Sequence, residues 1–221
     1  YTLWHTLSLH DALPILEVPA YYTIVPGAHF RERAAGTSVG MFSARLISEK
    51  QPPETALARL LEIEKVLPDT YYIKFYIGLS LLSLGDPDGA LLYFQRALDL
   101  EPPDEDIPSI YSYTGLCLKE MERYNDALEV LEKGIAVDPE RTDIYNLMGY
   151  CHFKLKAHES AIGCFKNILK LDPSSAIDYA NIASNYRDMG KMEKAIEYYR
   201  IALELDPAIE FARQNLDKLT G

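Results

Sequence analysis

Apolar residues recur every three or four positions along most of this chain, which is the spacing of one face of an α-helix. The stretch around residue 200 is representative, because polar and charged residues separate its apolar positions at that helical interval. Its apolar residues are Ala195, Ile196, Tyr199, Ala202, Leu203 and Leu205. The pattern predicts helix and argues against strand, in which apolar and polar residues would alternate.

The helical pattern itself repeats along the chain. In each unit an alanine lies twelve residues before a proline that closes an apolar stretch. The pairs are Ala56 and Pro68, Ala90 and Pro102, Ala127 and Pro139, Ala161 and Pro173, and Ala195 and Pro207. Successive prolines are 34 residues apart, except for a longer step between Pro102 and Pro139. Such a period predicts a solenoid of stacked helix pairs, because one pair is too small to bury its own apolar face.

The residues between these landmarks resemble the tetratricopeptide repeat (TPR). The last unit matches its pattern with Tyr179, Ile182, Ala183, Tyr186, Gly190, Ala195, Tyr199, Ala202 and Pro207. The resemblance implies an all-α fold, a right-handed superhelical solenoid of antiparallel helix pairs with a C-terminal capping helix. We predict five repeats, at 37–70, 71–104, 108–141, 142–175 and 176–209, and a capping helix at 210–221. The first repeat retains the fewest signature residues.

Small residues recur in the first helix of each predicted pair, where the second helix would cross it. They are Gly78, Gly115, Gly149 and Ala183. A larger side chain there would push the two backbones apart. One turn after the repeated alanine of the second helix, a larger apolar residue is expected to fill the space between units. These larger residues are Phe94, Leu131, Phe165 and Tyr199.

The first 36 residues do not follow the repeat. Residues 6–15 resemble the in-frame translation of a widely used DNA-sequencing adapter, so we interpret 1–15 as a library artefact and expect it to be disordered. The alternative is a short signal peptide, but this stretch lacks a basic start and His and Asp interrupt its apolar run. Because position 1 is not methionine, we expect the chain to be a fragment.

Residues 16–36 are predicted to be the remnant of a preceding domain. Residues 20–27 have the composition of a strand that ends in a Pro-Gly turn, and a lone strand is unstable without a sheet. The segment Ile24-Val25-Pro26-Gly27 is similar to one near the end of the catalytic domain of YcaO-type enzymes, which use ATP to activate peptide-backbone amides. That resemblance implies an alternative function, a substrate- or partner-recruiting C-terminal appendage of such an enzyme. None of that family's ATP- or Mg²⁺-binding residues maps onto this chain.

Composition narrows the choice of partners. The net charge of −11 disfavours nucleic acid and anionic membranes, since phosphate binding requires clustered Lys and Arg. The chain has no run of 18 apolar residues that would span a membrane. Three cysteines without CxxC spacing argue against disulfides and zinc, and suit a cytoplasmic location. We find no catalytic motif and predict no cofactor and no metal; the sequence does not indicate an oligomeric state.

The TPR resemblance implies a binding surface on the concave face, which the first helices of the pairs form. The residues at the positions that usually face this groove are Tyr72, Phe75, Tyr76, Leu79, Ser112, Tyr113, Leu116, Lys119, Asn146, Tyr150, Phe153, Asn181, Ser184 and Arg187. Aromatic side chains offer a large contact area, and asparagine can hydrogen-bond an extended backbone, so the predicted ligand is a peptide or a partner protein.

The predicted groove residues have an alternative role, and they do not match one known type of TPR binding site. Several of the aromatic residues have the alternative role of packing between adjacent first helices. In addition, TPR proteins that bind chaperone tails grip a C-terminal carboxylate with lysines at fixed positions, including the fifth of the repeat. That position holds Met41, Phe75, Ser112, Asn146 and Ala180 here, so we expect no such carboxylate clamp.

Overall fold

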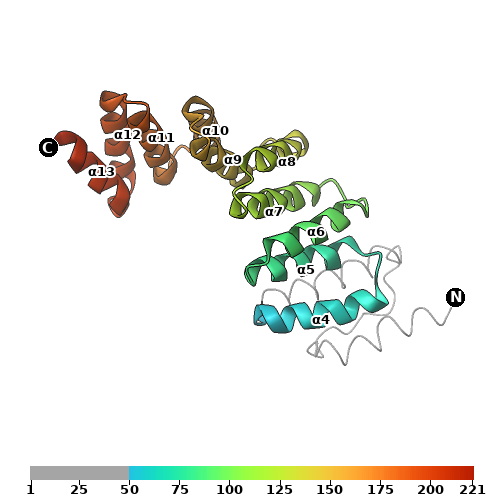
Figure 1. Cartoon of the computed structure of the whole chain (residues 1–221). Helices are drawn as coiled ribbons and strands as arrows, with labels where there is room; N and C mark the ends of the chain where they lie inside the picture. Colours follow the sequence, from blue (N-terminus) through green and yellow to red (C-terminus); the bar gives the residue numbers. More distant parts are fainter. Residues whose placement is uncertain (1–49) are drawn as a thin grey trace, which may run out of the picture.

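The computed structural model describes residues 50–221, which form ten α-helices and no strand (Figure 1). The helices are α4 (Pro53–Val66), α5 (Tyr71–Ser83), α6 (Pro87–Leu98), α7 (Ile107–Glu120), α8 (Tyr124–Val137), α9 (Thr142–Lys154), α10 (His158–Leu171), α11 (Ala176–Asp188), α12 (Met192–Leu205) and α13 (Glu210–Thr220). The predicted all-α solenoid is confirmed. The interpretations of 1–15 and 16–36, and the first helix of the first predicted repeat, lie outside the described residues.

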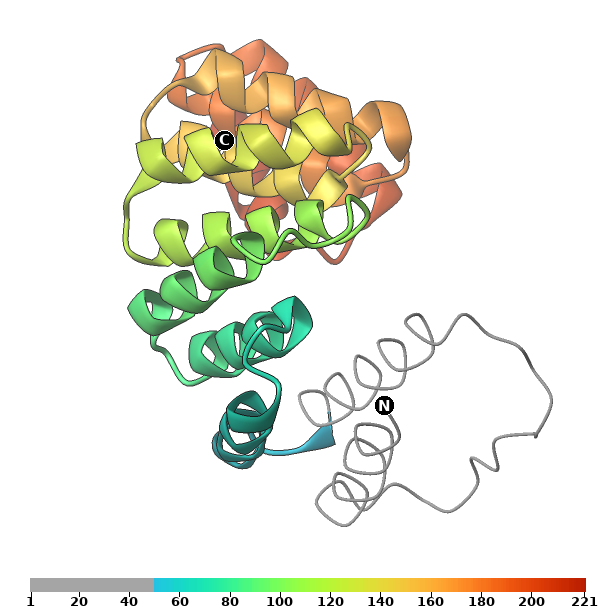
Figure 2. The ribbon, with the colours of Figure 1, turned by 90° about the vertical axis from the view of Figure 1, so that its right-hand side faces the viewer.

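The helices pack as antiparallel pairs: α5 with α6, α7 with α8, α9 with α10, and α11 with α12 (Figures 1 and 2). We call the earlier member of each pair its first helix and the later one its second helix. Each second helix also packs against the first helix of the next pair, and α4 packs against α5 in the same way. Because α7 contacts both α5 and α9 directly, the first helices line the inner side of the curved stack.

Two kinds of connection alternate along the stack. Three residues join the helices within each pair, whereas four residues join one pair to the next. The exception is the connection between α6 and α7, residues 99–106, where the sequence shows the longer step between prolines. Since paired helices are antiparallel, all connections between pairs lie at one edge of the solenoid and all turns within pairs lie at the opposite edge. We call the edge that holds the connections between pairs the junction edge.

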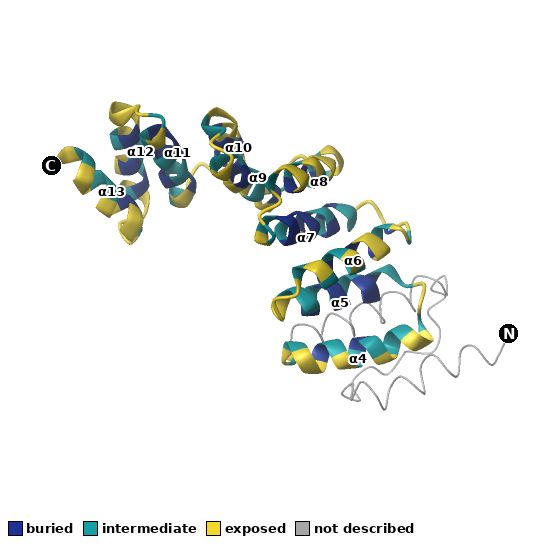
Figure 3. Ribbon diagram, in the orientation of Figure 1, coloured by how far each residue is buried: buried dark blue, intermediate teal, exposed yellow. Residues whose placement is uncertain are grey.

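The buried faces lie where helices meet, as the dark-blue bands show (Figure 3). Small residues of the first helices permit this contact. A Cβ added at Gly149 would lie 2.6 Å from the ring of Phe165, and one added at Gly115 would collide with Leu131. In the last pair Ala183 and Tyr199 are both fully buried. The predicted small-to-large packing of the helix crossings is therefore what the structure shows.

The last helix, α13, packs against α12 and has a single buried residue, Ala212. Leu216 and Leu219 lie against the apolar cluster that contains Tyr199. The remaining residues of α13 are mostly exposed and polar, so the helix covers the end of the apolar core with a polar outer face (Figure 3). A solenoid requires such an end, because an uncovered last pair would expose its apolar surface.

The turns within pairs share a left-handed residue. It is glycine in two turns, Gly85 with φ 78° and Gly190 with φ 76°, but Glu122 with φ 57° and Lys156 with φ 59° in the other two. A side chain in this conformation brings Cβ close to the carbonyl oxygen and costs roughly 1 kcal/mol, a cost that glycine avoids.

We therefore expect Lys156→Gly to raise the free energy of unfolding by about 0.5 kcal/mol, after allowing for the greater flexibility of glycine in the unfolded chain. The opposite change at the equivalent position of the next pair, Gly190→Ala, is expected to lower the free energy of unfolding by about 1 kcal/mol. Urea denaturation followed by circular dichroism measures both. Shifts of the same sign in the two variants would contradict the left-handed assignment.

Candidate functional site

A cleft of about 650 Å³ opens on the inner side of the solenoid, between α7, α9 and the start of α11. Four of the predicted groove residues line it, namely Ser112, Tyr113, Leu116 and Asn146. The other lining residues are Ser109, Arg141, Thr142, Asp143, Leu147, Ile168, Asp172, Ser175 and Asp178. We call this the inner cleft. Several of its residues belong to the connections between pairs, so it reaches the junction edge.

A fixed polar network forms one rim of the inner cleft. Arg141 donates two hydrogen bonds of 2.8 Å to the carboxylate of Asp143, and a third of 3.1 Å to the hydroxyl of Ser109. The Ser112 hydroxyl donates to the same carboxylate at 2.7 Å. Burial raises the pKa of Asp143, but the hydrogen bonds from Arg141 and Ser112 outweigh it and hold the pKa below its ordinary value. Asp143 is therefore a charged residue whose charge is already neutralised by Arg141.

A second carboxylate of the cleft has a different environment. Asp178 in the first turn of α11 is only 3% exposed and accepts a 2.6 Å hydrogen bond from the hydroxyl of Ser175. Burial raises its pKa above the ordinary value, and the hydrogen bonds from Ser175 and Asn181 offset this only in part. Within residues 50–221 Asp178 forms no ion pair. It is thus a carboxylate with hydrogen bonds but without a cation.

The walls of the inner cleft combine apolar surface with a free amide. Leu116 and Leu147 are partly buried and face the cleft from α7 and α9. Tyr113 is 37% exposed. The exposed side chain of Asn146 makes no hydrogen bond to any described residue. Apolar walls with an amide that can both donate and accept suit the backbone and side chains of an extended peptide.

The aromatic residues predicted at the N-terminal end of the groove pack mainly against one another. The ring of Phe75 lies 5.6 Å from that of Tyr113 and 5.7 Å from that of Phe94, centroid to centroid. Leu79 belongs to the same apolar cluster, and Tyr76 contacts Phe75 at 5.4 Å. For these residues the alternative role, packing between helices, describes the structure, and only Tyr113 reaches the inner cleft.

Tyr72, another predicted groove residue, is buried: it is 6% exposed and packs in the cluster of Ala56 and Leu60 between α4 and α5. A residue buried in this way offers no surface to a ligand. Ser112 is also 6% exposed, but its hydroxyl donates a hydrogen bond to Asp143 at the rim of the inner cleft. Repeat position alone does not predict the burial of Tyr72, because that burial depends on contact with α4.

Three more predicted residues lie outside the inner cleft, near the opposite edge. Tyr150 is 38% exposed, and the ammonium groups of Lys119 and Lys154 lie 5.0 Å and 5.5 Å from its ring centroid. The ring of Phe153 lies 5.9 Å from that of His158. Lys119 also pairs with Glu120 at 2.7 Å. These residues form local contacts at the ends of α7 and α9 and are not part of the cleft.

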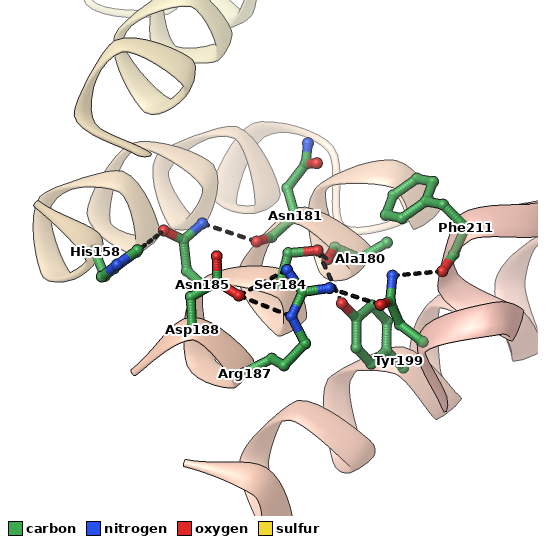
Figure 4. A network of polar contacts seen from close by, with 10 residues as sticks. His158, Ala180, Asn181, Ser184, Asn185, Arg187, Asp188, Tyr199 and Phe211 are labelled. Atoms are coloured by element: carbon green, nitrogen blue, oxygen red, sulfur yellow. Dashed lines mark hydrogen bonds and ion pairs between the residues drawn. The ribbon is translucent and has the colours of Figure 1, made fainter. Parts of the chain in front are cut away.

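The predicted residues of α11 are engaged in contacts that hold helices together (Figure 4). The Ser184 hydroxyl lies 2.9 Å from that of Tyr199 on α12, and Arg187 donates a 2.6 Å hydrogen bond to Asn215 on α13. The backbone carbonyl of Asn181 accepts from Asn185, whose amide oxygen lies 3.0 Å from His158 on α10. Ser184 and Arg187, both partly exposed, therefore bind neighbouring helices, and neither lines the inner cleft.

The sequence analysis did not identify Arg141 and Asp172, from connections between pairs, or Asp178, from the first turn of α11, as lining residues of the cleft. Repeat positions were considered only along the first helices, whereas Asp172 precedes the proline that ends a unit. The recurrence of an acidic residue before these prolines, in Asp138, Asp172 and Asp206, was the available signal.

A second cleft, of about 590 Å³, lies on the outer side between α6 and α8, with residues of α7 as its floor. Leu92, which is 52% exposed, lines it together with Leu91 and Val130. None of the predicted groove residues lines this second cleft.

The described residues contain no cluster of His, Cys, Asp and Glu that would hold a metal ion. Cys117, Cys151 and Cys164 are free and buried. Burial raises the pKa of Cys117 to about 12 and the pKa values of Cys151 and Cys164 to about 11. These thiols are therefore protonated at neutral pH, whereas nucleophiles and metal ligands are thiolates. Among these helices, none is both long and apolar enough to cross a bilayer.

Comparison with known families identifies the repeats. Profiles described as tetratricopeptide repeat match residues 71–104, 118–186 and 176–208, which together make up more than half of the chain. TPR repeat-containing protein MJ1428 of Methanocaldococcus jannaschii is 29% identical over 127 residues, 58% of this chain and 22% of that protein. Small glutamine-rich tetratricopeptide repeat-containing protein 2 of Mycosarcoma maydis is 26% identical over 117 residues, 52% of this chain and 33% of that protein. The matched part thus spans a third or less of each relative.

Solved structures share the fold. MamA from Desulfovibrio magneticus RS-1 superposes with a TM-score of 0.70 and 22% identity, covering 78% of this chain and 96% of that one. YrrB, which is described as a TPR protein with an unusual peptide-binding site, superposes with a TM-score of 0.69 and 19% identity. The YrrB match covers 85% of this chain and 98% of that one. At these levels of sequence identity the likeness shows the fold alone.

Proposed function

This chain belongs to the tetratricopeptide repeat family, and we propose that it is a protein interaction scaffold that binds a peptide or a segment of a partner protein in the inner cleft. The observation that carries the proposal is the cleft itself. Its walls combine apolar side chains, the exposed Tyr113 and the unengaged amide of Asn146. A few placed polar groups between apolar walls are typical of binding sites.

The rim supports binding without a large rearrangement. Arg141, Asp143, Ser109 and Ser112 already hold one another through hydrogen bonds, so α7 and α9 have a fixed relative position at the cleft. A site that is ordered before binding loses less conformational entropy when the ligand arrives. The description of YrrB as peptide-binding is consistent with this use of the fold.

The second candidate, recruitment of substrates or partners to a YcaO-type catalytic domain, depends on residues 16–36 and stays a prediction. It is compatible with the same cleft, because a recruiting appendage would also bind a polypeptide. Cloning the complete gene from genomic DNA and translating the upstream frame tests it. An ATP-binding domain upstream supports it, and any other domain overturns it.

A matched pair of tyrosines tests the cleft. Tyr113, 37% exposed, lines it, whereas Tyr150, 38% exposed, lies outside it. For a peptide selected on this protein from a displayed random library, we expect Tyr113→Ala or Asn146→Ala to weaken binding by roughly 2 kcal/mol, the cost typical of a central contact residue. Tyr150→Ala is expected to leave affinity within about twofold, since it alters a surface remote from the ligand. Calorimetric titration measures all three, and a loss confined to Tyr150→Ala would place the site outside the cleft.

A further inference from the structure

The net negative charge of the chain is concentrated at the junction edge. The connections between pairs, residues 67–70, 99–106, 138–141, 172–175 and 206–209, contain acidic residues throughout and only one basic residue, Arg141. The turns within pairs, at the opposite edge, contain three basic and two acidic residues. An edge with one sign of charge attracts a ligand of the opposite sign and speeds its association.

The inner cleft opens at this edge, and its own charges have the same sign. Of its four charged lining residues, three are aspartates and one is Arg141. Arg141 is bound to Asp143 by two hydrogen bonds, so that pair contributes little net charge. Asp172, which is exposed, and Asp178, which is buried, have no ion pair within the described residues. The cleft therefore has one exposed negative charge without a cation, that of Asp172.

Apolar and acidic surfaces lie in different parts of the cleft. Leu116 and Leu147 lie in the middle of α7 and α9, whereas Asp172 and Asp178 lie at the junction edge. Successive side chains of an extended peptide point in opposite directions. A peptide with alternating apolar and basic residues can thus place its apolar side chains against the leucines and its basic side chains against the acidic junction edge at Asp172.

We propose that the inner cleft selects an extended segment of a partner protein in which Lys or Arg alternates with apolar residues. This inference rests on the proposed function and specifies the chemistry of its ligand. Asp172 receives a basic side chain, Asn146 hydrogen-bonds the backbone of the segment, and Leu116 contacts its apolar side chains. The rest of the junction edge, including Glu101, Asp104, Glu105 and Asp106, steers the basic segment toward the cleft.

Three fluorescein-labelled peptides test the charge preference by anisotropy titration. In each, leucine alternates with a second residue, which is lysine, glutamine or glutamate. At low ionic strength we expect the lysine peptide to bind at least about tenfold more tightly than the glutamine peptide, and the glutamate peptide to bind least. Added salt is expected to reduce the advantage of lysine, because it screens the exposed charge of Asp172.

Matched substitutions locate the preference. Asp172 and Asp206 occupy equivalent Asp-Pro connections and accept equivalent backbone hydrogen bonds, from Ser174 and Ala208, but only Asp172 lines the cleft. We expect Asp172→Asn to remove most of the advantage of lysine over glutamine, and Asp206→Asn to leave it unchanged. Thermal melts of the variants verify that they remain folded.

The outcomes separate this inference from the proposed function. If the glutamine or glutamate peptide binds as tightly as the lysine peptide and Asn146→Ala weakens it, the cleft binds peptides without the charge preference and the inference is wrong. If Asp206→Asn weakens the lysine peptide as much as Asp172→Asn does, the edge attracts cations generally and the assignment to the cleft is wrong. If neither these peptides nor library-selected peptides bind, both the inference and the proposed function fail.

Discussion

Gly149→Leu is expected to lower the free energy of unfolding by about 3 kcal/mol, because it adds a side chain where two helices are already in contact. A Cβ at this position would lie 2.6 Å from the ring of Phe165, which is itself 4% exposed and cannot move into solvent without loss of its packing. The longer side chain must therefore separate α9 from α10. Denaturant unfolding followed by circular dichroism measures the loss.

The same substitution at Gly163 is the matched control. Gly163 lies within α10 of the same pair, is exposed, and has no atom within 4 Å of an added Cβ. Gly163→Leu is expected to raise the free energy of unfolding by about 0.5 kcal/mol, since leucine favours helix over glycine. Equal midpoints for the two variants would show that Gly149 does not lie at the helix crossing.

Glu64→Ala is expected to destabilise the protein by about 3 kcal/mol, because it leaves a buried ammonium group without its counterion. The Nζ of Lys74 lies 2.5 Å from a carboxylate oxygen of Glu64, and Lys74 as a whole is 8% exposed. The hydroxyl of Tyr93 donates to the other carboxylate oxygen at 3.2 Å. The substitution removes the shared acceptor of both groups and weakens the contacts among α4, α5 and α6.

An exposed pair on the same helix provides the control. Glu62 lies 2.6 Å from Lys65, but both side chains are more than half exposed. Glu62→Ala is therefore expected to change stability by less than about 0.5 kcal/mol. Replacing both members of the buried pair, with Glu64→Leu and Lys74→Met, should recover most of the loss, because no unpaired charge remains. A double variant as unstable as Glu64→Ala would mean that the lost packing, and not the charge, causes the destabilisation.

The helical class and the crossings of the solenoid were predictable because they depend on local rules. Gly149 lies one repeat after Gly115. Each of these glycines faces the large apolar residue that follows the repeated alanine of its pair by one helical turn. That regularity arises because every pair must bury its apolar face against the same kind of neighbour. Even the longer connection before α7 is visible as an irregular step between prolines.

The candidate site was predictable only in part. Tyr113 and Asn146 belong to the predicted groove and line the inner cleft. Ser184 and Arg187 of α11 occupy the repeat positions of Leu116 and Lys119, and they bind Tyr199 and Asn215. Arg187 meets α13, which lies beside the last pair in place of a further repeat, whereas Ser184 bonds to α12 of its own pair. Repeat position cannot indicate this difference.

The sequence by itself determined the helices, their pairing and the small residues at their crossings, because all of these follow from spacing along one chain. Only the tertiary structure decided which polar residues remain available to a ligand. It brings Asp172 and Asp178, from a connection and a helix start, beside Asn146 of the preceding pair. It also buries Tyr72 and pairs Arg141 with Asp143. The reason is physical: burial and charge pairing depend on the tilt and approach of neighbouring helices, which the period of the repeat leaves open.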